Sequence, residues 1–415
     1  MSIRICLGKG TLPARVYMTL MLSAPRDPSA LADPDAWWVE RRVLAREVME
    51  KGDYVTAYRI VAAHGAESSA LRAEAEFHAG WIALEYLKDP ATASRHFAVI
   101  QTISSMPLSQ SRAEYWLGRA AAAAGNHGEA TRQFQRAAAY PTTFYGQLAL
   151  AGLGVKKLSI SAPPKIDAAA RQRFASLELV QVLARLAEIK RDDRKQIFMR
   201  YLAETLTSPT DLALLTAMAE REGDHNLCLQ LGKTAASRGL PVDTLAFPTA
   251  AIPKSAKTGS VDKAIVYAIA RQESAFHPGA ISKAGARGLL QLMPATAKQM
   301  AKKAGVSYSK DKLTSDPGYN ATLGAEFLGH LIEHFNGSYV MAFAAYNAGP
   351  SRVAAWVEAY GDPRNPGVDV VNWIERIPFT ETRNYVQRIM ENMQVYRARL
   401  GSASLNIEKD LKRGG

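Results

Sequence analysis

A repeat in the first third of the chain is the feature that most limits the folds open to it. Three segments each place an alanine five residues after the first residue of a turn: "KGDYVTAY" from residue 51, "LKDPATAS" from residue 87 and "AGNHGEAT" from residue 124. The alanines, Ala57, Ala93 and Ala130, recur at a spacing of about 36 residues, which is the period of a helix pair stacked in a solenoid. The repeat therefore predicts stacked helix pairs.

The residues within each repeat support this prediction. Aromatic and small residues alternate at helical spacing in "EFHAGWIALEYL" and "AEYWLGRAAAAAG". Gly80 and Gly118 occupy equivalent places, and we expect them to let neighbouring helices approach closely. The second helix of a pair ends on a large residue such as Phe97 or Phe134. The pattern resembles degenerate tetratricopeptide repeats.

Helical signals continue through the rest of the chain, and no alternating strand pattern interrupts them, so we predict an all-α fold. A proline-rich stretch at 239–260 reads as a linker. Beyond it, Ser260 is expected to cap a helix, and Asp316 and Pro317 are an N-cap and a first helical residue. The predicted divisions are 1–33 as an uncertain leader, 34–155 as tetratricopeptide-like repeats, 156–250 as further helical repeats with the linker, 251–400 as a second domain and 401–415 as a tail.

Composition narrows the classes of partner. The 415 residues carry a formal net charge of +12, which favours anionic partners, but the basic residues form no dense run, so no nucleic acid is expected. Cys6 and Cys228 provide neither a disulfide framework nor a metal-binding pair. No apolar run approaches the roughly 18 residues that a membrane-spanning helix needs. The first residues include a mildly apolar stretch but make a poor signal peptide.

One acidic residue is isolated in a way that suggests chemistry. Glu273 is the only Asp or Glu between Asp262 and Asp311. It falls at the end of a predicted apolar helix, where burial and the negative end of the helix dipole both disfavour the carboxylate. We therefore expect a raised pKa, which suits a general acid, with no second acid nearby in the sequence.

The surroundings of Glu273 resemble a known family. "ESAFHPGAISKAGARGLLQLMPATA", "AAYNAGPSRV" and "WIERIPFTETRNYV" follow one another in the order seen in the soluble lytic transglycosylases, lysozyme-like enzymes that cleave bacterial peptidoglycan. The resemblance spans about residues 250 to 398, and the helical repeats are similar to the superhelical arm of these enzymes. It implies a lysozyme-like transglycosylase domain at 251–400.

The resemblance also implies a mechanism and a set of site residues. Glu273 would protonate the glycosidic oxygen between N-acetylmuramic acid and N-acetylglucosamine, then act as a base on the 6-hydroxyl of the muramic acid, which yields a 1,6-anhydro sugar. The substrate's N-acetyl group would replace a second carboxylate. Residues implied to bind substrate or support the acid are Ser282, Gln291, Met293, Tyr346, Asn347, Glu381 and Tyr385. The sequence departs from the family pattern at His277, Leu290 and Ser351.

The resemblance further implies peptidoglycan strands as partner, cell-wall or divisome proteins as partners of the repeats, a periplasmic location, and no metal or cofactor. Two other interpretations stay open. One is a non-catalytic repeat scaffold that binds wall glycan or proteins. The other is a metallopeptidase built on the H-x-x-E-H pattern of His330 and His334, although the helical spacing favours a solvated face for these histidines.

Overall fold

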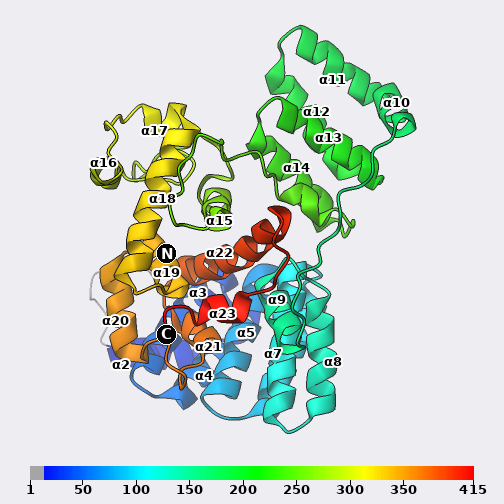
Figure 1. The fold of residues 1–415 in the computed structure, drawn as a ribbon. Coiled ribbons are helices and arrows are strands. Elements are labelled where there is room, and N and C mark those ends of the chain that lie inside the picture. The colour runs from blue at the N-terminus through cyan, green and yellow to red at the C-terminus, as the bar shows by residue number, and fades with distance from the viewer. Residues whose placement is uncertain (1–13) are drawn as a thin grey trace. The chain divides into compact units, whose positions relative to one another are not determined.

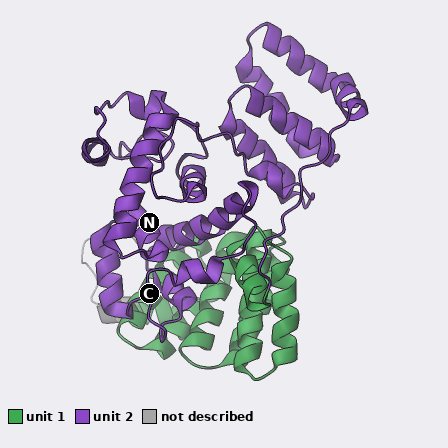
Figure 2. Cartoon of the chain, viewed as in Figure 1, with its two compact units in different colours: residues 1–154 green, residues 155–415 purple. Residues whose placement is uncertain are grey.

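This computed structural model describes residues 14–415, which form helices joined by turns and loops (Figure 1). Within these residues, β geometry is limited to isolated bridges. The prediction of an all-α fold is confirmed. The chain divides into two compact units at Gly154 (Figure 2). The predicted leader, 1–33, lies partly outside the described residues, and Cys6 lies wholly outside them. The described part of the leader contains helix α2 (Ala14–Ser23) and the 3-10 helix η1 (Pro28–Ala30).

The first unit consists of successive helix pairs. Its remaining helices are α3 Pro34–Glu50, α4 Tyr54–Ala62, α5 Ser69–Glu85, α6 Pro90–Ile103, α7 Pro107–Ala123, α8 His127–Ala138 and α9 Phe144–Gly152. Each helix packs against the next along the chain. This is the stacking of helix pairs that the repeat predicted.

The turns within these pairs are built alike. Each contains a residue with positive φ: Gly52 at 81°, Lys88 at 55° and Gly125 at 76°. The residue after it caps the following helix, because its side chain accepts a hydrogen bond from a backbone N–H of the first turn. These caps are Asp53, Asp89 and Asn126. The repeating alanines, Ala57, Ala93 and Ala130, are buried one turn later.

Close packing at two glycines is also confirmed. A Cβ atom on Gly80 would lie 2.5 Å from Cε1 of Phe97, and one on Gly118 would lie 2.6 Å from Cε1 of Phe134. Because real Cβ atoms do not approach so closely, only glycine lets these phenylalanine rings rest against the neighbouring helix.

The second unit begins with another helical group and continues into the domain that carries Glu273. The first group is α10 Ala168–Ser176, α11 Glu178–Glu188, α12 Asp192–Thr205, α13 Pro209–Arg221, α14 His225–Ser237 and the 3-10 helix η2 Asp243–Ala246. The second is α15 Lys263–Ser274, α16 Pro294–Lys303, α17 Lys312–Ser315, α18 Pro317–His334, α19 Tyr339–Ala348, α20 Pro350–Tyr360, α21 Val370–Arg376, α22 Thr380–Arg399 and α23 Ile407–Leu411.

Helices α15 and α22 pack against each other in the core of the second group. Ile265, Val266 and Ile269 of α15 are fully buried, as are Val386 and Ile389 of α22. Since burial of each such side chain is worth about 1.5–3 kcal/mol, this packing fixes the helix that ends at Glu273.

One of the two predicted helix N-caps is confirmed and the other is wrong. Asp316 caps α18 and Pro317 is its first residue, as predicted. The prediction for Ser260 is wrong. Asp262 caps α15 instead, accepting a hydrogen bond from the N–H of Ala264 at 2.9 Å, because a carboxylate two residues nearer the helix reaches this N–H directly.

Two segments predicted as linker and tail make specific contacts. In the linker stretch, Phe247 lies edge-on to Tyr396 of α22, with ring centroids 5.5 Å apart. At the end of the chain, the N–H of Leu405 donates to the carbonyl of Lys156 at 2.9 Å, and Asp410 of α23 pairs with Arg397. Over residues 14–415, no helix combines the length and apolar character needed to cross a membrane.

Candidate active site

Glu273 lies in the last turn of α15, and the chain turns sharply after it. The two residues after the end of α15 at Ser274 are Ala275 and Phe276, which have positive φ values of 49° and 64°. This left-handed conformation costs a residue with a side chain about 1–2 kcal/mol. Burial of the Phe276 ring beside Tyr267 and Tyr396 offsets part of this cost.

The carboxyl of Glu273 has a partner on a distant helix. The hydroxyl of Tyr385, in α22, donates a hydrogen bond to Oε1 of Glu273 at 2.8 Å. Burial raises the pKa of Glu273 to about 7; the hydrogen bond from Tyr385 opposes this shift, and the negative charge of Glu381 adds to it. A carboxyl with this pKa can both donate and accept a proton near neutrality.

Tyr346 completes the cluster around the acid. Its ring stacks on that of Tyr385, with centroids 6.4 Å apart and planes at 11°. Burial raises its pKa well above the usual value, and the charge of Glu273 adds to this. The Tyr346 hydroxyl donates to the carbonyl of Leu290 at 2.7 Å. Tyr385 makes the contact with the acid.

The segment 275–293, which we call the acid loop, is held by its own side chains. Nε2 of Gln291 donates to the carbonyls of Ala280 at 3.1 Å and Gly288 at 2.9 Å. Oγ of Ser282 accepts from the N–H of Ala286 at 3.0 Å and closes a turn. Gln291 therefore acts as a structural amide within the loop.

A buried asparagine fixes the acid loop from outside. Oδ1 of Asn320, in α18, accepts from the N–H of Leu290 at 2.9 Å, and its Nδ2 donates to the carbonyls of Arg287 and Leu313, each at 2.9 Å. A Cβ on Gly288 would lie 1.9 Å from the Leu313 oxygen and 2.2 Å from Nδ2 of Asn320. Only glycine fits between these groups.

Sequence analysis did not identify Asn320, although a signal was present. The residue lies on the same helical stripe as the buried Leu323 and Gly324, and a polar residue on an apolar stripe needs hydrogen-bond partners. Thr382 was missed as well. Its hydroxyl donates to Oδ1 of Asn347 at 2.6 Å, which joins the end of α19 to α22.

The remaining predicted residues lie nearer the surface. Met293 is 44% exposed at the start of α16, and Glu381 is exposed in the first turn of α22. The side chain of Arg383, two residues after Glu381, points into the core, where its Nε lies 3.6 Å from the buried carboxylate of Glu375.

Sequence comparisons match the region around this cluster. The family profile described as the Transglycosylase SLT domain matches residues 250–365, and the profile of the Soluble lytic transglycosylase helical domain matches residues 376–405. Residues 250–405 belong to the soluble lytic transglycosylase family. The predicted family is thereby confirmed.

Individual relatives cover the same transglycosylase domain. The Soluble lytic murein transglycosylase of Escherichia coli K12 is 37% identical over 142 residues, which are 34% of this chain and 21% of that protein. A Putative soluble lytic murein transglycosylase of Haemophilus influenzae is 37% identical over 131 residues, 32% of this chain and 21% of that protein. The matched part thus spans about a fifth of the length of these relatives.

Solved structures of transglycosylases share the fold over nearly the whole chain. An inactive mutant of the lytic transglycosylase Slt from Pseudomonas aeruginosa matches with a TM-score of 0.58 and 22% identity, over 96% of this chain and 75% of that one. The 70 kDa soluble lytic transglycosylase from Escherichia coli matches with a TM-score of 0.58 and 20% identity, over 98% and 68%. At these identities the likeness shows the fold: a helical superhelix with a lysozyme-like domain.

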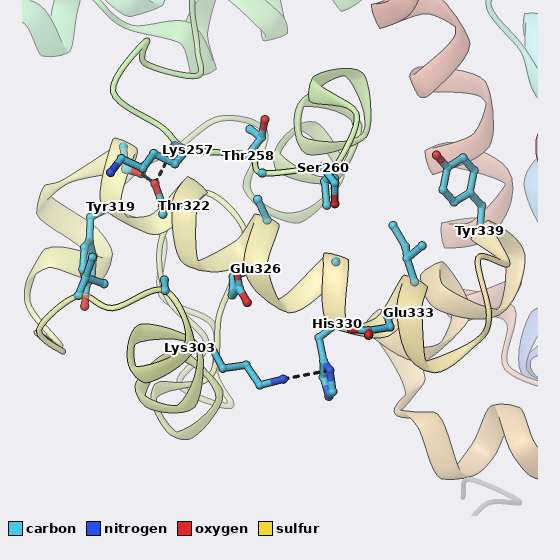
Figure 3. A pocket seen from close by; sticks show the side chains of 18 of the residues that line it. Lys257, Thr258, Ser260, Lys303, Tyr319, Thr322, Glu326, His330, Glu333 and Tyr339 are labelled. Atoms are coloured by element: carbon cyan, nitrogen blue, oxygen red, sulfur yellow. Dashed lines mark hydrogen bonds between the residues drawn. The ribbon is translucent and has the colours of Figure 1, made fainter.

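A separate cavity of about 1120 Å³ in the transglycosylase domain contains none of the predicted site residues (Figure 3). Lys257, Glu326 and His330 are among the residues that line it. Nζ of Lys303 lies 3.1 Å from Nδ1 of His330. The acid cluster is therefore defined by its contacts, and this cavity is lined by other residues.

The histidines of the H-x-x-E-H pattern lie on a solvent-exposed face of α18, as the helical spacing predicted. His330 and His334 are both exposed on α18, and the ring of His334 packs edge-on against Phe335 at 4.7 Å. Within residues 14–415 no group of three or more His, Cys, Asp or Glu side chains is arranged to hold a metal ion. The predicted solvated face is confirmed.

Proposed function

We propose that this protein is a peptidoglycan lytic transglycosylase. It cleaves the β-1,4 bond between N-acetylmuramic acid and N-acetylglucosamine and forms a 1,6-anhydro sugar. The observation that carries the proposal is the carboxyl of Glu273, which has a pKa of about 7 and accepts a hydrogen bond from Tyr385 at 2.8 Å. The family of residues 250–405 and the names of the relatives support it.

Glu273 performs both proton transfers in this proposal. Because Oε1 accepts the hydrogen bond from Tyr385, the carboxyl proton resides on Oε2 and is the one given to the glycosidic oxygen. The resulting carboxylate then removes the proton of the 6-hydroxyl, whose oxygen bonds to C1. The substrate's N-acetyl group stabilises the positive charge that develops at C1, so no second carboxylate is required.

The other predicted residues have supporting roles in the proposal. Ser282, Gln291 and Met293 shape the wall formed by the acid loop, and Tyr346 and Asn347 face it from α19. Glu381 supports the site by keeping the pKa of Glu273 high. No cofactor or metal takes part. The substrate implies a periplasmic location, and the helical repeats are surfaces for cell-wall or divisome proteins.

Mass spectrometry of digested peptidoglycan tests the proposal. Purified peptidoglycan is incubated with the protein, with Glu273→Gln and with Glu333→Gln, a control for an exposed glutamate of α18 outside the acid cluster. We expect anhydro-muropeptides from the unmodified protein and from the control, and none from Glu273→Gln. Reducing-end muropeptides would mean that water is the acceptor and the protein is a hydrolase. No product from any sample would favour the binding scaffold.

A further inference from the structure

A series of hydrogen bonds joins the helices before the transglycosylase domain to the turn after Glu273. Nδ2 of Asn226, in α14, donates to the carbonyl of Ala275 at 2.9 Å. Nε2 of Gln230, one turn further along α14, donates to Oδ1 of Asn226 at 2.7 Å. Nε of Arg200, in α12, donates to Oε1 of Gln230 at 3.3 Å.

The directions of these hydrogen bonds agree with one another. Arg200 only donates, so the oxygen of Gln230 must face it, and the nitrogen of Gln230 must then face Asn226. The oxygen of Asn226 is thereby occupied, and its nitrogen points at Ala275. Gln230 thus fixes the orientation of the Asn226 amide.

The 3-10 helix η2, which follows α14 in the chain, contacts α15 one turn before Ala275. Arg271 donates to the carbonyl of Ala246 in η2, and its guanidinium lies 4.1 Å from the ring centroid of Phe247. Residues 271 and 275 are four apart, so they share one side of the helix end, whereas Glu273, about 200° away from Arg271, lies on the other side. The side of α15 opposite the acid is therefore held at two points.

The turn held by Asn226 is the strained one. Ala275 and Phe276 are consecutive residues with side chains and positive φ, and such conformations persist only where surrounding contacts impose them. The carbonyl bound by Asn226 belongs to the first of these residues. A change of backbone angle there would move Glu273 relative to Tyr385.

We propose that Asn226 is a positioning residue for the catalytic acid, and that α14 takes part in the reaction through it although it precedes the matched domain. This inference rests on the proposed function. Asn226 touches no reacting atom; it holds the Ala275 turn so that Glu273 keeps its hydrogen bond to Tyr385 and its partly buried position. Displacements of about 1 Å at a catalytic group can reduce rates a hundredfold.

The test compares Asn226→Leu with Gln230→Leu and a matched control, Gln110→Leu. Gln110 lies in α7 of the first unit and donates to the carbonyls of Gln101 and Ser104, so its loss removes similar hydrogen bonds within the unit that does not contain the acid. We expect Asn226→Leu to lower kcat ten- to a hundredfold with KM within twofold of the unmodified protein. Gln230→Leu should produce a smaller loss of kcat, and Gln110→Leu none.

Carbon-13 NMR of the labelled carboxyl of Glu273 provides a second measurement that does not need activity. We expect its titration midpoint in Asn226→Leu to fall towards the ordinary value of 4.5, because burial is the largest cause of the raised pKa and a released turn admits water. If the unmodified protein yields no anhydro product, the proposed function fails, and the shift of midpoint still decides the role of Asn226.

Two results would overturn the inference. One is a folded Asn226→Leu protein with kcat within twofold of the unmodified protein and an unchanged midpoint for Glu273. The other is a loss of activity in Asn226→Leu that Gln110→Leu reproduces at equal loss of melting temperature, which would mean general destabilisation. Partial recovery of kcat in Asn226→Ser, whose hydroxyl can donate over a shorter reach, would support the positioning role.

Discussion

The repeats of the first unit and the acid loop fix their backbones in different ways. In the repeats, the same turn recurs with the same type of cap, and two equivalent glycines accept equivalent phenylalanines. In the acid loop each contact is used once: Gln291 from within, Asn320 from α18 and Asn226 from α14. The repeats can therefore be recognised from periodicity, whereas the loop depends on distant partners. Four substitutions sharpen this comparison.

The largest effect is expected at Gly288 of the acid loop. Gly288→Ala places a Cβ 1.9 Å from the Leu313 carbonyl oxygen at a φ of 76°. Overpacking and the left-handed backbone together should lower the free energy of unfolding by about 3–5 kcal/mol and abolish activity. Gly285→Ala is the control, since Gly285 has a φ of 89° and nothing within 4 Å of its Cβ position. Equal urea midpoints for the two variants would contradict the role of Asn320.

The ionised carboxyl of Glu273 should lower the stability of the folded protein at neutral pH. The capping residues of the repeats, in contrast, stabilise their helices. The folded pKa of Glu273, about 7, lies above its ordinary value of 4.5, so the folded state binds more protons between these values and stability falls as pH rises through this window. Glu273→Gln removes the titration. We expect it to match the unmodified protein near pH 4 and to exceed it by up to roughly 3 kcal/mol at pH 8, measured by urea unfolding at both pH values. A constant difference would argue against the raised pKa.

A glycine of the repeats should affect stability without affecting chemistry. Gly80→Ala brings a Cβ to 2.5 Å from the Phe97 ring, so we expect a loss of about 1–3 kcal/mol and an unchanged kcat at temperatures where the protein is folded. Gly152→Ala, at an open helical position, should be neutral or stabilising by up to about 1 kcal/mol. Thermal unfolding compares them, and a fall in kcat for folded Gly80→Ala would link the repeats to the acid.

The smallest effect is expected for Tyr385→Phe. The hydrogen bond from Tyr385 lowers the pKa of Glu273, so its removal should raise that pKa above about 7 and move the alkaline limb of the pH–rate profile to higher pH. We expect kcat near pH 6 to fall about tenfold, as for the loss of one hydrogen bond worth roughly 1.4 kcal/mol. Tyr339→Phe, in a part of α19 away from the acid, should leave the profile unchanged. An unmoved limb in Tyr385→Phe would mean that Tyr385 only packs against Tyr346.

Local sequence signals predicted much of the fold and the acid. The spacing of Ala57, Ala93 and Ala130, together with Gly80 and Gly118, predicted the helix pairs, because a solenoid repeats its contacts at the period of its sequence. The position of Glu273 at the end of an apolar helix predicted a raised pKa, since an apolar setting and the negative end of the helix dipole both disfavour the carboxylate. The misplaced cap at Ser260 shows the limit of such signals where two candidates lie close together.

The tertiary structure decided which side chains meet. Tyr385, and not Tyr346, contacts Glu273, and the partners are 112 residues apart in the chain. Asn320 and Asn226 bind backbone groups of the acid loop, and no spacing in the sequence pairs an amide with a particular carbonyl. The sequence by itself determined the helices and the acid because periodicity, the pattern of apolar residues and the motif around Glu273 are local properties of the chain. The contacts that hold Glu273 in place were decided only when α14, α18 and α22 came together around the end of α15.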